Sequence, residues 1–199
     1  EFALDIQTDS FTMSIQKNYG PDLQDTVVSD ASGSVKIPSL PNLNDPDAVV
    51  STEYINFANT SLSLWAGKTE NITSSITSFR LLDSNGNKIV VDTDPNNPLV
   101  ITLARGPRSA LNENETVSCQ YLNDFAQDLV WSTAGCYVNS TTDEFIVCHC
   151  NHTTSFAAFI QFTQDELDRP LTKIQKGTYY VAIIFYIIYF IISVSLFIF

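Results

Sequence analysis

The sequence predicts an all-β protein, an antiparallel β-sandwich over residues 1–162, followed by a single transmembrane α-helix over residues 179–199. Three observations support this fold class. Short runs of alternating apolar and polar residues recur about every ten residues and are separated by Pro, Gly and Asn turns. No long window before residue 163 shows a sustained helical period. The last 21 residues carry no charge, and this length is enough to cross a bilayer.

The predicted strands are the short runs in which apolar residues alternate or cluster. They contain Leu4 and Ile6; Phe11, Met13 and Ile15; Val35 and Ile37; Tyr54, Ile55 and Phe57; Phe79, Leu81 and Leu82; Ile89, Val90 and Val91; and Leu99, Ile101 and Leu103. Asn85-Gly86 separates two of these runs, and both residues tolerate positive φ angles, so we expect a hairpin there. The first two runs read as half-buried strands.

A polar connector, residues 163–178, separates the predicted sandwich from the apolar run. Fully extended, it would reach at most about 55 Å, so we expect the sandwich to stay close to a membrane. A buried core helix or a removable lipid-anchor signal fits residues 179–199 less well than a membrane span does. We expect the chain to be an interior piece of a larger protein, with this run as its first or only span.

The charge balance and the glycosylation signals indicate an extracellular domain. With 10 basic and 22 acidic residues, the net charge is −12, which repels phosphate backbones, so no nucleic-acid partner is expected. Five positions fit the N-glycosylation pattern, and we expect glycans at four of them: Asn59, Asn71, Asn114 and Asn139. A glycan at the fifth, Asn151, would crowd the motif described below, so we expect that position to be unused.

Four cysteines are present: Cys119, Cys136, Cys148 and Cys150. In an oxidising compartment they are expected to form two disulfides, for which three pairings exist. Cys148 and Cys150 point to the same face of a strand, and a bond between them would strain a two-residue link. Each is therefore expected to bond to an upstream cysteine. A metal site built from these cysteines with His149 and His152 is the rival interpretation, but the upstream cysteines lack metal-ligand spacing.

Thr153 and Thr154 follow His152, and this order allows one covalent reaction. His152 could take the proton of the Thr154 hydroxyl, which would then attack the carbonyl carbon of Thr153. The peptide bond would become an ester that water cleaves, provided that a strained turn presents the carbonyl to the hydroxyl. His149 faces away from the cysteines in an extended strand and is expected to be an ordinary surface or packed residue.

Together these residues resemble the GPS motif, the proteolysis site at the end of GAIN domains. Trp131-Ser132-Thr133-Ala134-Gly135-Cys136 and Cys148-His149-Cys150-Asn151-His152-Thr153-Thr154 match its fixed positions with one exception, and an apolar strand follows. The motif covers residues 119–162, and the strands before it resemble the β-sandwich half of a GAIN domain, subdomain B. Two departures stand out: Thr153 replaces the usual Leu, and Tyr121 and Leu122 stand where a Trp is frequent.

The resemblance implies a set of site roles. Cys119 would pair with Cys148 and Cys136 with Cys150, which is also the pairing that we favour, and Trp131 would pack in the core beside the disulfides. His152, Thr153 and Thr154 would carry out self-cleavage between Thr153 and Thr154, with both fragments remaining associated. The strand after the cut would stay buried as a tethered segment, with both faces apolar as in a central strand; it comprises Ser155, Phe156, Ala157, Ala158, Phe159 and Ile160.

The expected function is that of an extracellular juxtamembrane region in a polycystin-type protein or an adhesion G-protein-coupled receptor, with a slight preference for the polycystin type. It would serve signalling or mechanosensing at a plasma or ciliary membrane. The alternatives are a structural membrane anchor of a large extracellular assembly, an uncleaved spacer, and a ligand-binding sandwich with an idle motif. No cofactor or metal is expected, and catalysis would be at most one turnover in cis. Expected partners are membrane lipid, the chain's own N-terminal extracellular region, and a channel subunit, ligand or extracellular assembly.

Overall fold

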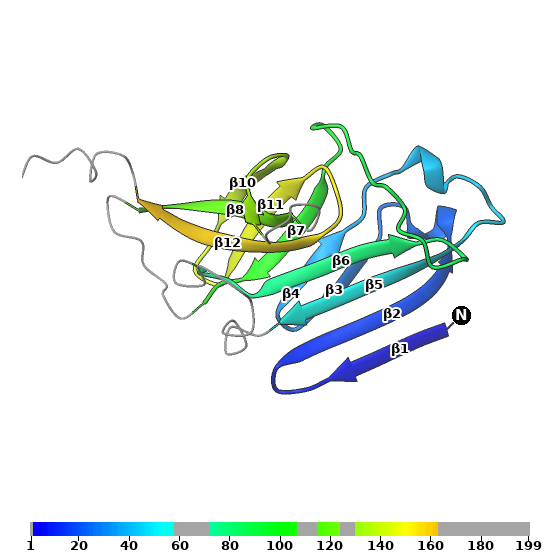
Figure 1. Ribbon diagram of the computed structural model, residues 1–199, viewed down its shortest axis with the longest axis horizontal. Coiled ribbons are helices and arrows are strands. Elements are labelled where there is room, and N and C mark those ends of the chain that lie inside the picture. The colour runs from blue at the N-terminus through cyan, green and yellow to red at the C-terminus, as the bar shows by residue number, and fades with distance from the viewer. Residues whose placement is uncertain (1, 58–71, 107–114, 124–129, 163–199) are drawn as a thin grey trace, which may run out of the picture. The chain divides into compact units, whose positions relative to one another are not determined.

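Two antiparallel sheets enclose a common core (Figure 1). The computed structural model describes residues 2–57, 72–106, 115–123 and 130–162. In this part of the chain every strand pairing is antiparallel, and the predicted all-β antiparallel sandwich is confirmed. Two 3-10 turns, η1 (Gly20–Leu23) and η2 (Pro41–Leu43), join strands near one end.

The larger sheet has the order β1-β2-β5-β6-β12-β8-β9. Its strands are β1 (Phe2–Gln7), β2 (Phe11–Tyr19), β5 (Val49–Phe57), β6 (Ile76–Leu82), β12 (Ser155–Phe162), β8 (Glu115–Asn123) and β9 (Val130–Ser132). The smaller sheet has the order β10-β11-β7-β4-β3, with β10 (Cys136–Thr141), β11 (Phe145–Cys150), β7 (Leu99–Ala104), β4 (Gly33–Lys36) and β3 (Val27–Asp30). The last strand of the domain, β12, is thus an internal strand of the larger sheet.

The core lies between the sheets, where alternate residues of each strand point inward. The fully buried side chains come from both sheets and include Val35, Ile37, Tyr54, Phe79, Leu81, Leu99, Ile101, Leu103, Ile146 and Phe156. A second, smaller cluster is formed by residues of the larger sheet itself, Ile76 on β6 and Ala157 and Phe159 on β12. The larger sheet therefore buries apolar residues on both faces around β12.

The expectation of a half-buried strand is wrong for β1, where Leu4 and Ile6 are 41% and 40% exposed. The smaller sheet has two strands fewer than the larger one, and strands are about 4.8 Å apart, so it cannot cover the full width. Its edge strand β3 reaches β2, where the Thr12 hydroxyl donates to the Asp30 carboxylate. β1 lies beyond this point as an edge strand.

The Asn85-Gly86 turn is present, with Gly86 at φ 82°. The Gly86 N–H donates to the Asp83 carbonyl at 3.0 Å, and the Asp83 carboxylate accepts from the N–H groups of Asn85 and Asn87. The returning residues do not form the expected strand, however. After one bridge between Leu82 and Lys88, the chain leaves the sheet.

A polar group lies inside the sandwich between β5 and β3. The Tyr54 hydroxyl donates to Asp30 Oδ1 at 3.1 Å and accepts from Asn56 Nδ2 at 3.2 Å. Burial raises the pKa of Tyr54 well above its ordinary value, and the negative charge of Asp30 acts in the same direction, while the bond from Asn56 opposes them. Tyr54 is therefore a neutral hydrogen-bond donor inside the core.

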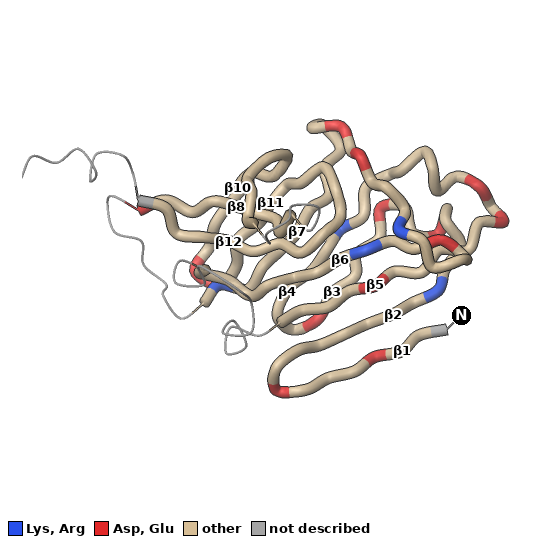
Figure 2. Tube along the Cα trace, viewed as in Figure 1, with Lys and Arg blue, Asp and Glu red and all other residues tan. Residues whose placement is uncertain are grey.

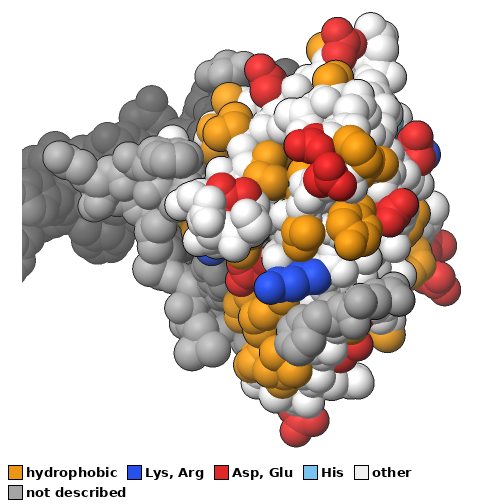
Figure 3. Space-filling view, turned by 90° about the vertical axis from the view of Figure 1, so that its right-hand side faces the viewer, with side chains coloured by type: hydrophobic (Ala, Val, Ile, Leu, Met, Phe, Trp, Pro, Cys, Tyr) orange, Lys and Arg blue, Asp and Glu red, His pale blue; other side chains and the backbone are white. Residues whose placement is uncertain are grey.

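Acidic residues are spread over strands and turns with few basic ones among them (Figure 2), and acidic side chains also outnumber basic ones on the face seen in Figure 3. This agrees with the net charge of −12. Within the described residues there is no helix of sufficient length and apolarity to span a membrane. The predicted linker and the predicted transmembrane helix, residues 163–199, lie outside the described residues.

Candidate functional site

The residues of the predicted cleavage motif form a short crossing between the two sheets. β11 of the smaller sheet ends at Cys150, and β12 of the larger sheet begins at Ser155. Only residues 151–154 connect them. The Thr153–Thr154 peptide bond therefore lies at the point where the chain passes from one sheet to the other.

Backbone hydrogen bonds hold this crossing on both sides. The Asn151 N–H donates to the Gly135 carbonyl at 3.0 Å, and the Asn151 carbonyl accepts from the Thr93 N–H at 3.0 Å. At the other end, the Thr154 carbonyl accepts from the Phe79 N–H at 2.9 Å. The crossing is thus anchored to three separate segments of the domain, which keeps its conformation fixed.

β12 is bound along both of its edges. One edge pairs continuously with β8, from Phe156 opposite Tyr121 to Phe162 opposite Glu115. The other edge pairs with the start of β6 and then with the segment before it, where Ala158 accepts from the Thr73 N–H and donates to the Ser74 hydroxyl, both at 2.8 Å. β12 is therefore fully integrated into the sheet, as expected for a central strand.

The two faces of β12 contribute to different clusters. Phe156 and Ala158 point into the main core, whereas Ala157 and Phe159 belong to the smaller cluster on the opposite face. The whole expected tethered segment is buried: Ser155, Phe156, Ala157, Ala158, Phe159 and Ile160. Apolar residues at both odd and even positions of this segment thus correspond to burial on both faces of the strand.

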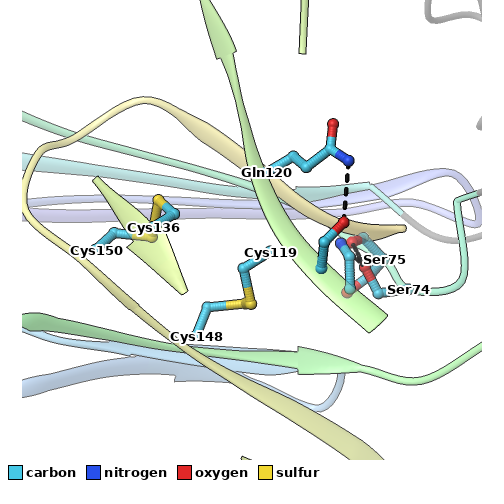
Figure 4. The surroundings of a disulfide bond; sticks show 9 residues. Ser74, Ser75, Cys119, Gln120, Cys136, Cys148 and Cys150 are labelled. Carbon is cyan, nitrogen blue, oxygen red and sulfur yellow. Dashed lines mark hydrogen bonds between the residues drawn. A yellow bond between two sulfur atoms is a disulfide. The ribbon is translucent and has the colours of Figure 1, made fainter. Parts of the chain in front are cut away.

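Figure 4 shows the two disulfides, Cys119–Cys148 and Cys136–Cys150. All four cysteines precede the Thr153–Thr154 bond in the sequence. Cys119–Cys148 joins β8 to β11 and so connects the two sheets, while Cys136–Cys150 joins the paired strands β10 and β11. The predicted presence of disulfides is confirmed. Since each of the four sulfurs is in one of these two disulfides, none is available to a metal ion, and the rival metal interpretation of the cysteines fails.

The two threonines of the scissile bond are buried, with Thr153 2% and Thr154 6% exposed. The Thr154 hydroxyl lies 2.9 Å from the Leu122 carbonyl on β8. Because a carbonyl can only accept, the hydroxyl donates its proton to Leu122. The Thr153 hydroxyl has no hydrogen-bond partner among the described residues. Cleavage would require the Thr154 hydroxyl to give up its hydrogen bond to the Leu122 carbonyl and to donate its proton to a base instead.

His152 lies between aromatic rings and an amide. Its ring makes an edge contact with Tyr121 at 4.2 Å between centroids and lies 5.9 Å from the ring of Phe156. Its Nδ1 is 2.8 Å from Asn151 Oδ1. Tyr121, one of the departures from the family pattern, therefore fixes one side of the imidazole.

The backbone angles at the crossing are not left-handed. Among the described non-glycine residues only Asp25 has a positive φ, and no residue of 151–154 does. The strained turn that the cleavage chemistry requires is therefore not found in the φ angles of this crossing. Gly135 on the neighbouring turn does have a positive φ, 74°, directly beside Asn151.

A cavity of about 560 Å³ borders the scissile bond. This volume admits the water molecule that ester hydrolysis needs. Its lining comes from the crossing, from β8 and from the turn segments on either side: Lys88, Val90, Val91, Tyr121, Asn123, Ala134, Gly135, Asn151, His152, Thr153 and Thr154.

Two other expected residues are placed by the structure. His149 points away from the cystines toward Tyr137, whose hydroxyl lies 3.2 Å from Nδ1, and burial lowers the His149 pKa. Trp131 does not lie in the core beside the disulfides, contrary to expectation. It packs against Phe159 in the smaller cluster at 5.1 Å between centroids.

Strand register explains the position of Trp131. It pairs directly with Leu122, so both side chains project from the same face of the sheet. Cys119 is three positions from Leu122 along β8, an odd number, and therefore projects from the opposite face. The family motif specifies a Trp at position 131, but the face of the sheet from which Trp131 projects depends on its pairing with Leu122.

Of the expected glycosylation sites, Asn139 is exposed on the edge strand β10, at an irregularity between Val138 and Ser140. Asn59, Asn71 and Asn114 lie outside the described residues. Asn151 is partly buried, with its amide packed against Gly135.

Comparison with known proteins identifies the family. The family model for GPS, described as GAIN subdomain B, matches residues 3–164. The chain belongs to the GAIN subdomain B family. Human adhesion G-protein coupled receptor G7 is 46% identical over 48 residues, which are 24% of this chain and 6% of that receptor. Mouse adhesion G-protein coupled receptor G5 is 38% identical over 69 residues, 31% of this chain and 13% of that receptor. The chain thus spans only a small part of the length of these relatives.

Four features of the site are not predicted by the sequence. These are the Asn151 amide at His152, the Gly135 turn beneath it, the Leu122 carbonyl that accepts from Thr154, and the Tyr121 ring. A signal was present for Gly135, since a glycine in a turn before Cys136 indicates a positive φ. The Leu122 carbonyl has no sequence signal, because any residue supplies a carbonyl.

Proposed function

We propose that this chain is the extracellular juxtamembrane GAIN/GPS region of an adhesion-receptor-like membrane protein and that it cleaves itself between Thr153 and Thr154. In this proposal residues 1–162 form the GAIN-like sandwich, residues 163–178 an extracellular linker and residues 179–199 a transmembrane helix. The protein acts at the plasma membrane in signalling or mechanosensing. Membership of the family and the likeness to adhesion receptors support this assignment.

One observation carries the cleavage proposal. The residue that follows the scissile bond presents a buried hydroxyl at the start of an internal strand, and a histidine two positions earlier lies at the same crossing. The Thr154 oxygen forms a bond to the carbonyl carbon of Thr153 and gives its proton to His152. The carbon–nitrogen bond then breaks, and the freed amine takes up a proton. Water hydrolyses the resulting ester, which restores the hydroxyl and leaves a carboxylate on Thr153.

The fragments stay together because β12 remains in the sheet. Both disulfides lie in the N-terminal fragment, so no covalent bond joins the fragments after cleavage. The buried side chains and the two hydrogen-bonded edges of β12 provide the attachment. When a ligand or force removes the N-terminal fragment, the strand from Thr154 becomes available as a tethered signal.

A denaturing gel tests the cleavage. The full chain is expected to give two fragments after removal of glycans, and Thr154→Ala is expected to give one. Thr154→Ser, which retains a hydroxyl, should still give two. A single band from the unmodified chain would show that the domain is an uncleaved spacer or anchor.

A membrane-fractionation experiment tests the other part of the proposal. The full chain expressed in cells is expected to remain with membranes after carbonate extraction, and a chain that ends at residue 178 is expected to be released. Release of both would refute the transmembrane assignment of residues 179–199.

A further inference from the structure

The Asn151 side chain occupies a place in which little else fits. A Cβ atom added to Gly135 would lie 2.2 Å from Asn151 Oδ1 and 3.0 Å from Nδ2, so the amide lies directly on the glycine backbone. The positive φ of Gly135 turns the chain so that this contact forms, and the Asn151 N–H binds the Gly135 carbonyl. Two contacts therefore fix the amide: its packing against Gly135, and the hydrogen bond from the Asn151 N–H to the Gly135 carbonyl.

From this position the amide contacts the imidazole. Asn151 Oδ1 lies 2.8 Å from His152 Nδ1. Because an amide oxygen only accepts, Nδ1 must carry the hydrogen, and the neutral ring then has its lone pair on Nε2. The ring is also held by the edge contact with Tyr121 and by the neighbouring ring of Phe156. A neutral histidine can act as a base only through the nitrogen that lacks a hydrogen.

We propose that Asn151 is a positioning residue for the cleavage reaction: it holds His152 as the Nδ1–H tautomer and thereby makes Nε2 the base that accepts the Thr154 proton. This inference rests on the proposed self-cleavage at Thr153–Thr154. Asn151 contacts the ring at Nδ1, which is not the nitrogen that takes the proton. It acts through the ring, as the orienting member of a nucleophile–base–orienter arrangement does.

The contact between the Asn151 amide and Gly135 also bears on glycosylation at Asn151. Thr153 in place of the usual Leu creates an Asn-x-Thr sequon at Asn151. A glycan would be attached to Nδ2, which lies against Gly135 and beside the crossing. Positioning and glycosylation therefore exclude each other, and the folded, cleavage-competent chain carries an unmodified Asn151.

The first test measures the rate of cleavage after refolding of the full chain as a function of pH. Asn151→Ala is expected to slow cleavage by about 10- to 100-fold, part of the 10²–10⁴ that a general base contributes. Asn151→Asp keeps the acceptor oxygen and is expected to restore cleavage. Its carboxylate favours the charged imidazole, so the midpoint of the pH profile should rise by about 1 unit or more. Among the described residues, Tyr121 is in contact with the ring and Lys88 lines the same cavity, and both of these ionisable groups are left unchanged.

The control for loss of a sequon is Asn139→Ala, since Asn139 is exposed and distant in sequence from the crossing. It is expected to cleave at the unmodified rate. Mass spectrometry of the peptide that contains Asn151 is expected to show no glycan. An Asn151→Ala chain that cleaves like the Asn139→Ala chain would overturn the proposal, as would a glycan on Asn151 in the cleaved protein.

The second test does not depend on cleavage. In the Thr154→Ala chain, nitrogen NMR of the two histidines, His149 and His152, reads the tautomer of each ring directly. His152 is expected as Nδ1–H, and adding Asn151→Ala is expected to change this, while His149 serves as the internal reference. An Nε2–H ring on His152 in the Thr154→Ala chain overturns the positioning role even if the unmodified chain cleaves itself. A retained tautomer effect without cleavage would refute only the proposed function.

Discussion

Replacing Phe156 with Ala tests whether β12 is held mainly by its buried side chains. Phe156 is 1% exposed in the main core, two residues after the scissile bond. Truncation of a buried Phe to Ala costs about 3–5 kcal/mol, through lost burial and the cavity that remains. In the uncleaved Thr154→Ala background, the free energy of unfolding should fall by this amount. Since urea slopes are about 1–3 kcal/mol per molar, the midpoint should fall by about 1 M or more.

In the cleaved complex the same change weakens the attachment of the two fragments. A loss of about 3–5 kcal/mol corresponds to about 150- to 5000-fold in the dissociation constant. The assay is release of the N-terminal fragment from the immobilised C-terminal fragment across a urea series. Gln161→Ala is the matched control, because Gln161 is exposed on the same strand and its loss should change stability by no more than about 0.5 kcal/mol. Release of both variants at the same urea concentration would refute the view that side-chain burial holds β12.

Three further changes test other parts of the domain in the Thr154→Ala background. Thr153→Val should raise the unfolding free energy by about 1 kcal/mol, because it removes a buried hydroxyl without a described partner; a loss of stability in urea denaturation would show that this hydroxyl is bonded. Replacing Cys119 and Cys148 together with Ala opens a loop of sequence separation 29, which should cost about 3.5 kcal/mol, or roughly 7–14 °C in Tm by calorimetry; an unchanged Tm would contradict the role of this cystine. Tyr54 ionises near pH 10.0 when unfolded but keeps its proton when folded, so its contribution is complete below pH 10.0 and falls above it by about 1.4 kcal/mol per pH unit. Tyr54→Phe should flatten that part of the stability profile, and a profile that stays equally steep above pH 10.0 would refute the assignment.

The sequence was sufficient for the fold class and for the elements whose pattern is set by burial. The alternating residues of β7, Leu99, Ile101 and Leu103, are all fully buried, and the doubly apolar run after Ser155 is an internal strand. Local patterns failed where the answer depends on the partner. The alternation of β1 predicts burial, but the smaller sheet does not extend over it, and the face of Trp131 is set by its pairing with Leu122.

The candidate site was predictable as a set of residues and only partly as a geometry. The motif specified His152, Thr153 and Thr154, and the structure brings them to one crossing. What it could not specify are contacts made by backbone atoms, such as the Leu122 carbonyl that accepts from Thr154, because such contacts depend on register and carry no residue signature. The amide at His152 is adjacent in sequence, but its role depends on the Gly135 turn, which approaches from β10.

The exposed edge strand at the N-terminal side has a mechanical consequence. Tension applied at Phe2 would act on β1 first, and among the described residues β1 is paired along one edge only, with β2. Peeling its 6 residues would release about 20 Å of chain before the load reached β2. A small or brief force would thus be relieved by the detachment of β1. Only a sustained force would be transmitted to the buried strand β12.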